Sequence, residues 1–105
     1  MLAKELKIVE TFKELVSQRL TVLEVRVFGS RARGDASEDS DLDVLVVVDR
    51  LDHEIDKYIS ECAWEAGFPE DIVLVPMAIS IDSLKNSPLR DSVFIRNVYR
   101  EGVGV

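Results

Sequence analysis

Apolar and charged residues alternate along the first twenty positions with the period of a helix. Leucine, valine and phenylalanine side chains recur three or four residues apart between residues 2 and 20, while lysines and glutamates occupy positions between them. This spacing is typical of a helix that packs one apolar face on a core and exposes the other face to water. We therefore predict an amphipathic helix over residues 2–20.

Two short segments after this helix have the composition of β-strands. Residues 22–28 contain β-branched and aromatic side chains and stop at Gly29, and residues 42–48 read LDVLVVV. A nearly continuous apolar run indicates a strand that is buried on both faces, in the middle of a sheet. Between these strands, the serines, glycines and charged residues up to Asp41 predict a loop with no more than one helical turn.

A second helix and a third strand are expected next. Asp52 is a suitable N-cap for a helix over about residues 53–66, and Gly67 stands where a helix-terminating glycine is common. Residues 72–79 (IVLVPMAI) have the composition of a strand. Because Pro76 cannot donate a backbone hydrogen bond, this strand should lie at the edge of the sheet or contain a bulge.

The last helix is predicted from its two ends. Ser87 followed by Pro88 is a favourable start, because serine caps a helix and proline fits the first turn, and Gly102 marks the end after Arg100. The predicted order is helix, strand, loop, strand, helix, strand, helix. This order predicts an α/β (α+β) domain with a small mixed sheet of three or more strands, flanked by helices.

Composition places the chain among ordinary globular domains. Its 105 residues are close to the commonest size of one domain, so we expect a single domain over residues 1–105. The chain is 47% hydrophobic and 31% charged, and no apolar run approaches the ~20 residues of a membrane-spanning helix. The net charge of -7 opposes nucleic-acid binding over an extended surface, although a small anion could still be held locally.

Cysteine usage and the N-terminal residues bear on the cellular compartment. Cys62 is the only cysteine, so an intrachain disulfide is excluded. The chain begins Met-Leu-Ala-Lys-Glu, without the apolar core of a signal peptide. Both observations lead us to expect a protein of the reducing cytoplasm.

Residues able to carry chemistry are concentrated in the loop between the first two strands, which reads GSRARGDASEDSDLD from Gly29 to Asp43. Asp41 and Asp43 are two positions apart at the start of a strand, so their side chains should project from the same face. Adjacent carboxylates repel each other unless a cation lies between them, and Mg²⁺ prefers such oxygen ligands together with water and phosphate. The turn at Gly29 and Ser30 is complementary, because a glycine lets a phosphate approach backbone N–H groups.

Other sites with similar spacing do not fit these residues. Gly29 and Gly34 match the glycines of a P-loop, but Asp35 stands where its lysine is required. An EF-hand that started at Asp35 would need a glycine in place of Ser40 and a glutamate in place of Val46. A solvated acidic connection is the remaining alternative, although charge buried beside the most apolar strand is costly without a partner.

The same loop resembles the signature of the DNA polymerase β nucleotidyltransferase superfamily. The shared features are Gly29-Ser30, the following Arg31-Ala32-Arg33-Gly34, Ser40, and Asp41-x-Asp43. Within the superfamily the chain is most similar to the minimal nucleotidyltransferase (MNT) proteins, and the likeness extends from the leading helix to the final one. The resemblance implies transfer of a nucleoside monophosphate from a nucleoside triphosphate, with ATP as the expected donor, to an acceptor hydroxyl.

The resemblance also implies how the first part of the loop is used. Gly29 and Ser30 would hold the triphosphate. Arg31 and Arg33 would either add positive charge near the phosphates or be solvated loop residues.

Three carboxylates are the expected catalytic and metal-binding groups. Asp41 and Asp43 would bind two Mg²⁺ ions, because paired metals stabilise the attacking and leaving oxygens of an in-line displacement. The superfamily takes a third carboxylate from the next strand, whose interior contains no acid in this chain. Asp71 is our prediction for that carboxylate, with an ordinary residue at the start of a strand as the alternative.

Superfamily members generally carry extra domains for the acceptor and the base, and we expect none here. The resemblance therefore implies a homodimer or a complex with a small helical HEPN-type protein, which the chain would nucleotidylate as the antitoxin of a toxin–antitoxin pair. Trp64 fits poorly on the apolar face of its helix and is either an exposed docking residue or an ordinary packed one. The alternative function is a non-catalytic nucleotide-binding module that works by occluding its partner.

Overall fold

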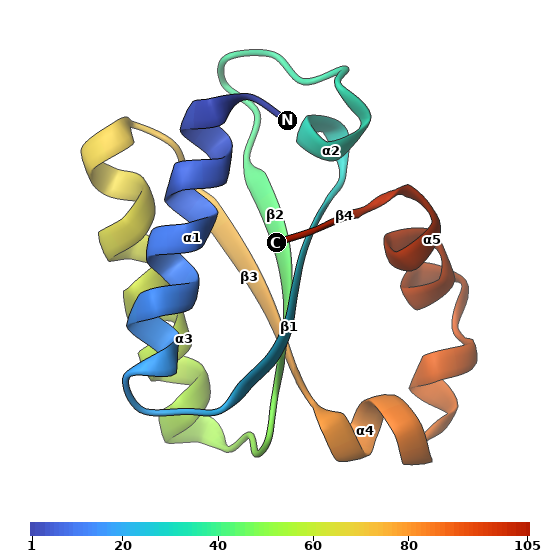
Figure 1. Ribbon diagram of the computed structural model, residues 1–105. Coiled ribbons are helices and arrows are strands. Elements are labelled where there is room, and N and C mark those ends of the chain that lie inside the picture. Colours follow the sequence, from blue (N-terminus) through green and yellow to red (C-terminus); the bar gives the residue numbers. More distant parts are fainter.

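A four-stranded mixed sheet in the order β3-β2-β1-β4 runs through the molecule. The computed structural model describes residues 1–105 (Figure 1). β1 is antiparallel to both of its neighbours, whereas β2 and β3 are parallel. The predicted small mixed sheet is therefore confirmed. The strands are β1 (Val22–Phe28), β2 (Leu42–Val48), β3 (Leu74–Ser80) and β4 (Val103–Gly104).

Helices cover both faces of this sheet (Figure 1). On one face lie α1 (Ala3–Ser17) and α3 (His53–Gly67), and on the other lie α4 (Ile81–Asn86) and α5 (Val93–Glu101). The short α2 (Ser30–Arg33) follows β1 directly. Two 3₁₀ turns, η1 (Phe68–Glu70) and η2 (Pro88–Asp91), complete the fold. No helix is both long and apolar enough to cross a membrane.

β2 is apolar throughout because its side chains enter two separate cores. Its even-numbered residues belong to the larger core, together with Phe12 of α1 and Ile59 of α3. Leu45 and Val47 belong to a smaller core under α5. Since successive side chains of a strand point to opposite faces, Asp43 lies on the same face as Leu45 and Val47. The alternation thus directs this carboxylate toward the α5 side of the sheet.

Several predicted elements are confirmed, and the sequence reasons for them hold. The strands at 22–28 and 42–48 have the predicted bounds, and the loop between them contains one helical turn, α2. Asp52 caps α3, because its carboxylate accepts a hydrogen bond from the Ile55 N–H at 2.8 Å. β3 is an edge strand, as Pro76 predicted.

The C-terminal part of the chain differs from the prediction. The single helix expected from Pro88 to Arg100 is wrong, because η2 ends at Asp91. The hydroxyl of the next residue, Ser92, caps a new helix by accepting from the Ile95 N–H at 3.2 Å. α4 and β4 were not predicted. α4 begins where the Ser80 hydroxyl accepts from the Ser83 N–H at 3.1 Å, a capping signal of the same kind.

The helix predicted over about residues 53–66, with Gly67 just beyond its end, is one residue longer in the structure. Gly67 is the last residue of α3 and keeps a right-handed backbone, with φ of -88°. A glycine is required there because a Cβ atom would collide with the backbone carbonyl oxygen of Ile72. The left-handed residue is Asp71, which ends η1 with φ of 55°.

Candidate active site

The two aspartates lie together at the start of β2. Asp43 is half-buried and pairs with Phe28 across the β1–β2 ladder, while Asp41 is exposed just before the strand. Burial raises the pKa of the Asp43 carboxyl, the nearby Asp41 carboxylate raises it further, and the positive charge of Arg33 opposes both effects. The structure therefore brings together the pair of mutually repelling carboxylates that the sequence predicted.

The Gly29 backbone lies directly beside the Asp43 carboxylate. Gly29 has φ of 75° and ψ of -159°, a conformation essentially restricted to glycine. A Cβ atom built on it would lie 2.5 Å from the Asp43 Oδ2 atom, so no side chain fits between the turn and the carboxylate. Ser30 then begins α2, whose first backbone N–H groups have no acceptor inside the helix. The turn and the carboxylate pair form one continuous site.

Arg31 is buried, holds the end of the loop, and lines the same cavity as Asp41. Its guanidinium donates to the Glu5 carboxylate at 2.8 Å and twice to the Ser40 carbonyl, at 2.7 and 2.9 Å. A fourth hydrogen bond reaches the Glu38 carbonyl at 3.2 Å. Since Ser40 immediately precedes Asp41, Arg31 fixes the position of the backbone that carries the carboxylate pair. Its predicted role as a direct phosphate ligand stays a prediction.

Glu5 completes this buried ion pair from α1. Burial raises the pKa of the Glu5 carboxyl, but hydrogen bonds from Arg31 and from the Leu2 N–H outweigh that effect, so the pKa is lowered overall. Sequence reasoning missed Glu5 as a site-supporting residue. In the sequence, Glu5 is one glutamate on the first turn of the N-terminal helix. Without the fold, it cannot be distinguished from a solvent-exposed glutamate.

Arg33 is an exposed cation whose charge acts on Asp43. Its guanidinium contacts the Asp35 carboxylate at 3.3 Å and the Glu101 carboxylate at 3.9 Å. Both are exposed pairs, which are weak and leave the side chain free to rearrange. Its effect on the pKa of Asp43 indicates that it lies close enough to act on a group bound there. Arg33 thus adds positive charge close to Asp43 while making only weak, exposed ion pairs.

Asp71 does not join the other two carboxylates in one cluster. It is exposed, and it lines a cavity of about 640 Å³ together with Asp41 but without Asp43. The parallel register instead places Val75 of β3 beside Asp43, on the same face of the sheet. No group of three or more His, Cys, Asp or Glu side chains is arranged to hold a metal ion. Asp71 as the third carboxylate stays a prediction.

The residues present fit a divalent cation bound at the Asp41–Asp43 pair. Two oxygen ligands of this kind are sufficient for Mg²⁺, which completes its coordination with water and phosphate oxygens. The partly buried Asp43, with its raised pKa, is a group whose ionised form such a cation would stabilise. The pair alone, however, does not provide a complete protein ligand set for two ions.

Comparison with known proteins identifies the fold and the family of the chain. Two solved structures share the fold. A toxin–antitoxin crystallised with AMP-PNP has a TM-score of 0.65 at 21% identity, over 95% of this chain and 70% of that chain. A mutant of the toxin–antitoxin MntA-HpeT has a TM-score of 0.58 at 19% identity, over 95% and 70%. No curated protein matches the chain. The model of the nucleotidyltransferase domain family matches residues 7–101, so the chain belongs to that family.

Proposed function

We propose that the chain is a Mg²⁺-dependent nucleotidyltransferase that moves a nucleoside monophosphate from a nucleoside triphosphate, with ATP as the expected donor, to an acceptor hydroxyl. One observation carries the proposal: the Gly29 backbone lies against the Asp43 carboxylate, with no space for a side chain between them. A triphosphate at the turn would therefore lie next to the carboxylate pair. Membership of the nucleotidyltransferase domain family supports the same reading.

In this proposal each residue has a separate task. Gly29 leaves the backbone open to the phosphates, and the first N–H groups of α2, from Ser30 onward, donate hydrogen bonds to them. Asp41 and Asp43 hold Mg²⁺, as two ions if the resemblance to the polymerase β superfamily extends to their number. When bound, Mg²⁺ neutralises phosphate charge and polarises phosphoryl oxygens. Arg33 adds positive charge from its exposed position.

The proposed reaction is a nucleophilic displacement at the α-phosphorus of the triphosphate. The acceptor oxygen forms a bond to the α-phosphorus, the bond from that phosphorus to the bridging oxygen breaks, and pyrophosphate leaves. The acceptor proton is released to solvent. The chain contributes chiefly by positioning and by charge, which is how phosphoryl-transfer enzymes reach most of their rate.

We further propose that the chain is an MNT-type antitoxin whose acceptor hydroxyl belongs to a partner protein. The two structural neighbours are both described as toxin–antitoxin structures, one of them with an ATP analogue, AMP-PNP. A small helical HEPN-type protein is the expected partner, and a homodimer is the other assembly to test.

A second candidate function is supported by the residue that β3 places beside Asp43, where the superfamily has its third carboxylate. Val75, and not an acid, lies beside Asp43 in the sheet register. A chain that lacks this carboxylate could retain triphosphate binding while transfer is slow or absent. In that case the protein would be a nucleotide-binding module that acts by occluding its partner.

Label transfer distinguishes the two functions. The wild-type protein is incubated with Mg²⁺, lysate of the native host and ATP labelled at either the α or the γ phosphorus. Transfer of α label, but not γ label, to a protein supports nucleotidyl transfer, and the Asp41→Asn/Asp43→Asn variant should abolish it. Binding of ATP without any transfer of label supports the occluding module.

A further inference from the structure

Four large apolar side chains are exposed together at the β3 edge of the sheet. Trp64 and Phe68 of α3 retain 64% and 67% of their surface, and their rings stack with centroids 5.0 Å apart. Val73 and Val75 are 58% and 41% exposed. We call these four residues the edge surface. Clustered exposed aromatic and aliphatic side chains are characteristic of protein-binding sites, since isolated exposed apolar residues need no explanation but a contiguous patch does.

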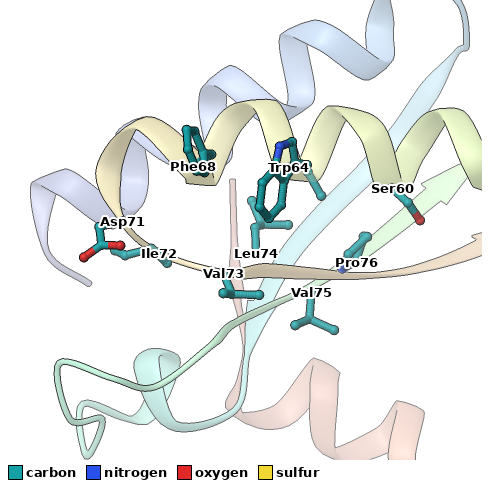
Figure 2. Close-up of a pocket in the computed structure, with 10 residues that line it drawn as sticks. Ser60, Trp64, Phe68, Asp71, Ile72, Val73, Leu74, Val75 and Pro76 are labelled. Carbon is teal, nitrogen blue, oxygen red and sulfur yellow. The ribbon is translucent and has the colours of Figure 1, made fainter.

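The edge surface surrounds an open groove rather than a flat patch. A cavity of about 430 Å³ lies between α3 and the start of β3, with Ala63 and Leu74 in its lining. Figure 2 shows Trp64 and Phe68 on the α3 side of the strand and the two valines projecting from the other side. The apolar surface therefore continues around the edge of the sheet, from one face to the other.

Acidic residues border this groove. Glu61 and Glu65 lie on the same stretch of α3 as Trp64, with Lys57 as the one basic residue of that surface. Glu70 and Asp71 follow Phe68 and Pro69. Two copies of the chain that met through this surface would bring acidic borders together, because a two-fold interface pairs each patch with itself. A second copy is therefore disfavoured, and basic flanking residues are favoured on the occupant.

Pro76 disfavours one other way of docking. A strand added to the open edge of β3 needs backbone donors along that edge, and proline has none. Gly67 also packs tightly against the backbone around Ile72 and Leu74, which covers the start of the strand. Recognition by side chains that enter the groove is therefore favoured, as when the apolar face of a helix docks.

The edge surface is continuous with the candidate active site. Val73 lines both the apolar groove and the larger cavity that contains Asp41. Val75 is the register partner of Asp43 and lies on the same face of the sheet. A protein bound at the edge surface would thus reach the carboxylate pair without crossing another element.

We propose that the edge surface docks a partner protein through an amphipathic helix whose apolar face is flanked by lysine or arginine. This inference rests on the proposed function in one respect: the docked partner would present its acceptor hydroxyl to the neighbouring site. Docking itself follows from exposure, shape and charge. It can be measured without nucleotide or metal.

Two helical peptides of about 18 residues, or five turns, test the proposal. They share one leucine face, which is flanked by lysine and arginine in the first peptide and by glutamate in the second. Trp64 is the only tryptophan of the chain, so its fluorescence reports on the groove directly. We expect the basic peptide to shift the emission to shorter wavelength and to bind at least about tenfold more tightly than the acidic one.

Variants localise the binding. Phe68→Ser and Val73→Ser should each weaken the basic peptide about tenfold, whereas Leu23→Ser, which alters a comparably exposed side chain on β1, should have no effect. Glu61→Lys/Glu65→Lys should reverse the preference between the two peptides. Circular dichroism checks that each variant is folded.

Several results would overturn the proposal. These are equal affinity for both peptides, absence of binding by the basic peptide at millimolar concentration, or a dimer in sedimentation velocity that Phe68→Ser abolishes, which would make a second copy the occupant. The Asp41→Asn/Asp43→Asn variant should bind the basic peptide normally. Loss of label transfer with normal peptide binding would therefore count against the proposed function and not against the docking surface.

Discussion

Replacing Gly29 by alanine tests the contact between the turn and the carboxylate pair. The backbone at Gly29 has φ of 75° and ψ of -159°, where a residue with a Cβ atom is strained by about 1 to 3 kcal/mol. The new Cβ atom would also lie 2.5 Å from the Asp43 Oδ2 atom, so the carboxylate must move. We expect the free energy of unfolding to fall by at least this strain. Affinity for Mg²⁺ and ATP should fall about 10- to 100-fold, because changes in the groups that position a metal ligand have effects of that size on metal affinity.

Gly34→Ala provides a matched control for the backbone strain. Gly34 ends α2 with φ of 83° and ψ of 12°, and a Cβ atom there meets nothing within 4 Å. Its replacement should cost about 1 to 2 kcal/mol of stability while leaving binding within about twofold. Urea unfolding measures stability, and calorimetry on the folded variants measures affinity for Mg²⁺ and ATP. Normal binding by folded Gly29→Ala would refute the reasoning, since Gly29 would then be only a turn residue.

Three further predictions concern charge and protonation. Asp41→Asn/Asp43→Asn should leave the metal-free protein as stable as the wild type or more stable, because it removes a repulsion; a loss of stability in urea unfolding would contradict this. Glu5→Gln should cost about 3 to 5 kcal/mol at pH 7, because it breaks the buried pair with Arg31. The pKa of Glu5 is lower in the folded protein than its unfolded value of 4.5. The difference in stability between wild type and Glu5→Gln should therefore shrink as the pH falls below 4.5 and through the folded-state pKa. A stability difference that does not change with pH would count against the ion pair. Burial and the hydrogen bond that Tyr99 donates to Glu24 raise the pKa of Tyr99 to about 12. The tyrosine absorbance step at the higher pH should therefore disappear in Tyr99→Phe.

Local signals in the sequence predicted most of the sheet and the position of the carboxylate pair. The strand at 42–48 was recognisable because both of its faces are buried, and Pro76 correctly placed the third strand at an edge. Asp41 and Asp43 were found from their spacing alone, since side chains two apart on an extended chain share a face. Each of these features is determined by interactions or side-chain directions within a few consecutive residues.

Features that depend on contacts distant in sequence could not be predicted in the same way. The role of Arg31 depends on Glu5, which lies 26 residues earlier, and on the carbonyl of Ser40. The requirement for glycine at position 67 depends on the carbonyl of Ile72, which approaches only after η1 turns the chain. Likewise, Val75 could be identified as the neighbour of Asp43 only from the register of two parallel strands.

Calorimetric titration with an ATP analogue that has a methylene group between its α and β phosphorus atoms tests the proposed site most directly, because the analogue can bind but cannot transfer its monophosphate. The titration is run on the wild type and on Asp41→Asn/Asp43→Asn, each with and without Mg²⁺. We expect binding only by the wild type in the presence of Mg²⁺. The same affinity in the double variant, or in the wild type without Mg²⁺, would contradict a nucleotide site built on the Asp41–Asp43 pair.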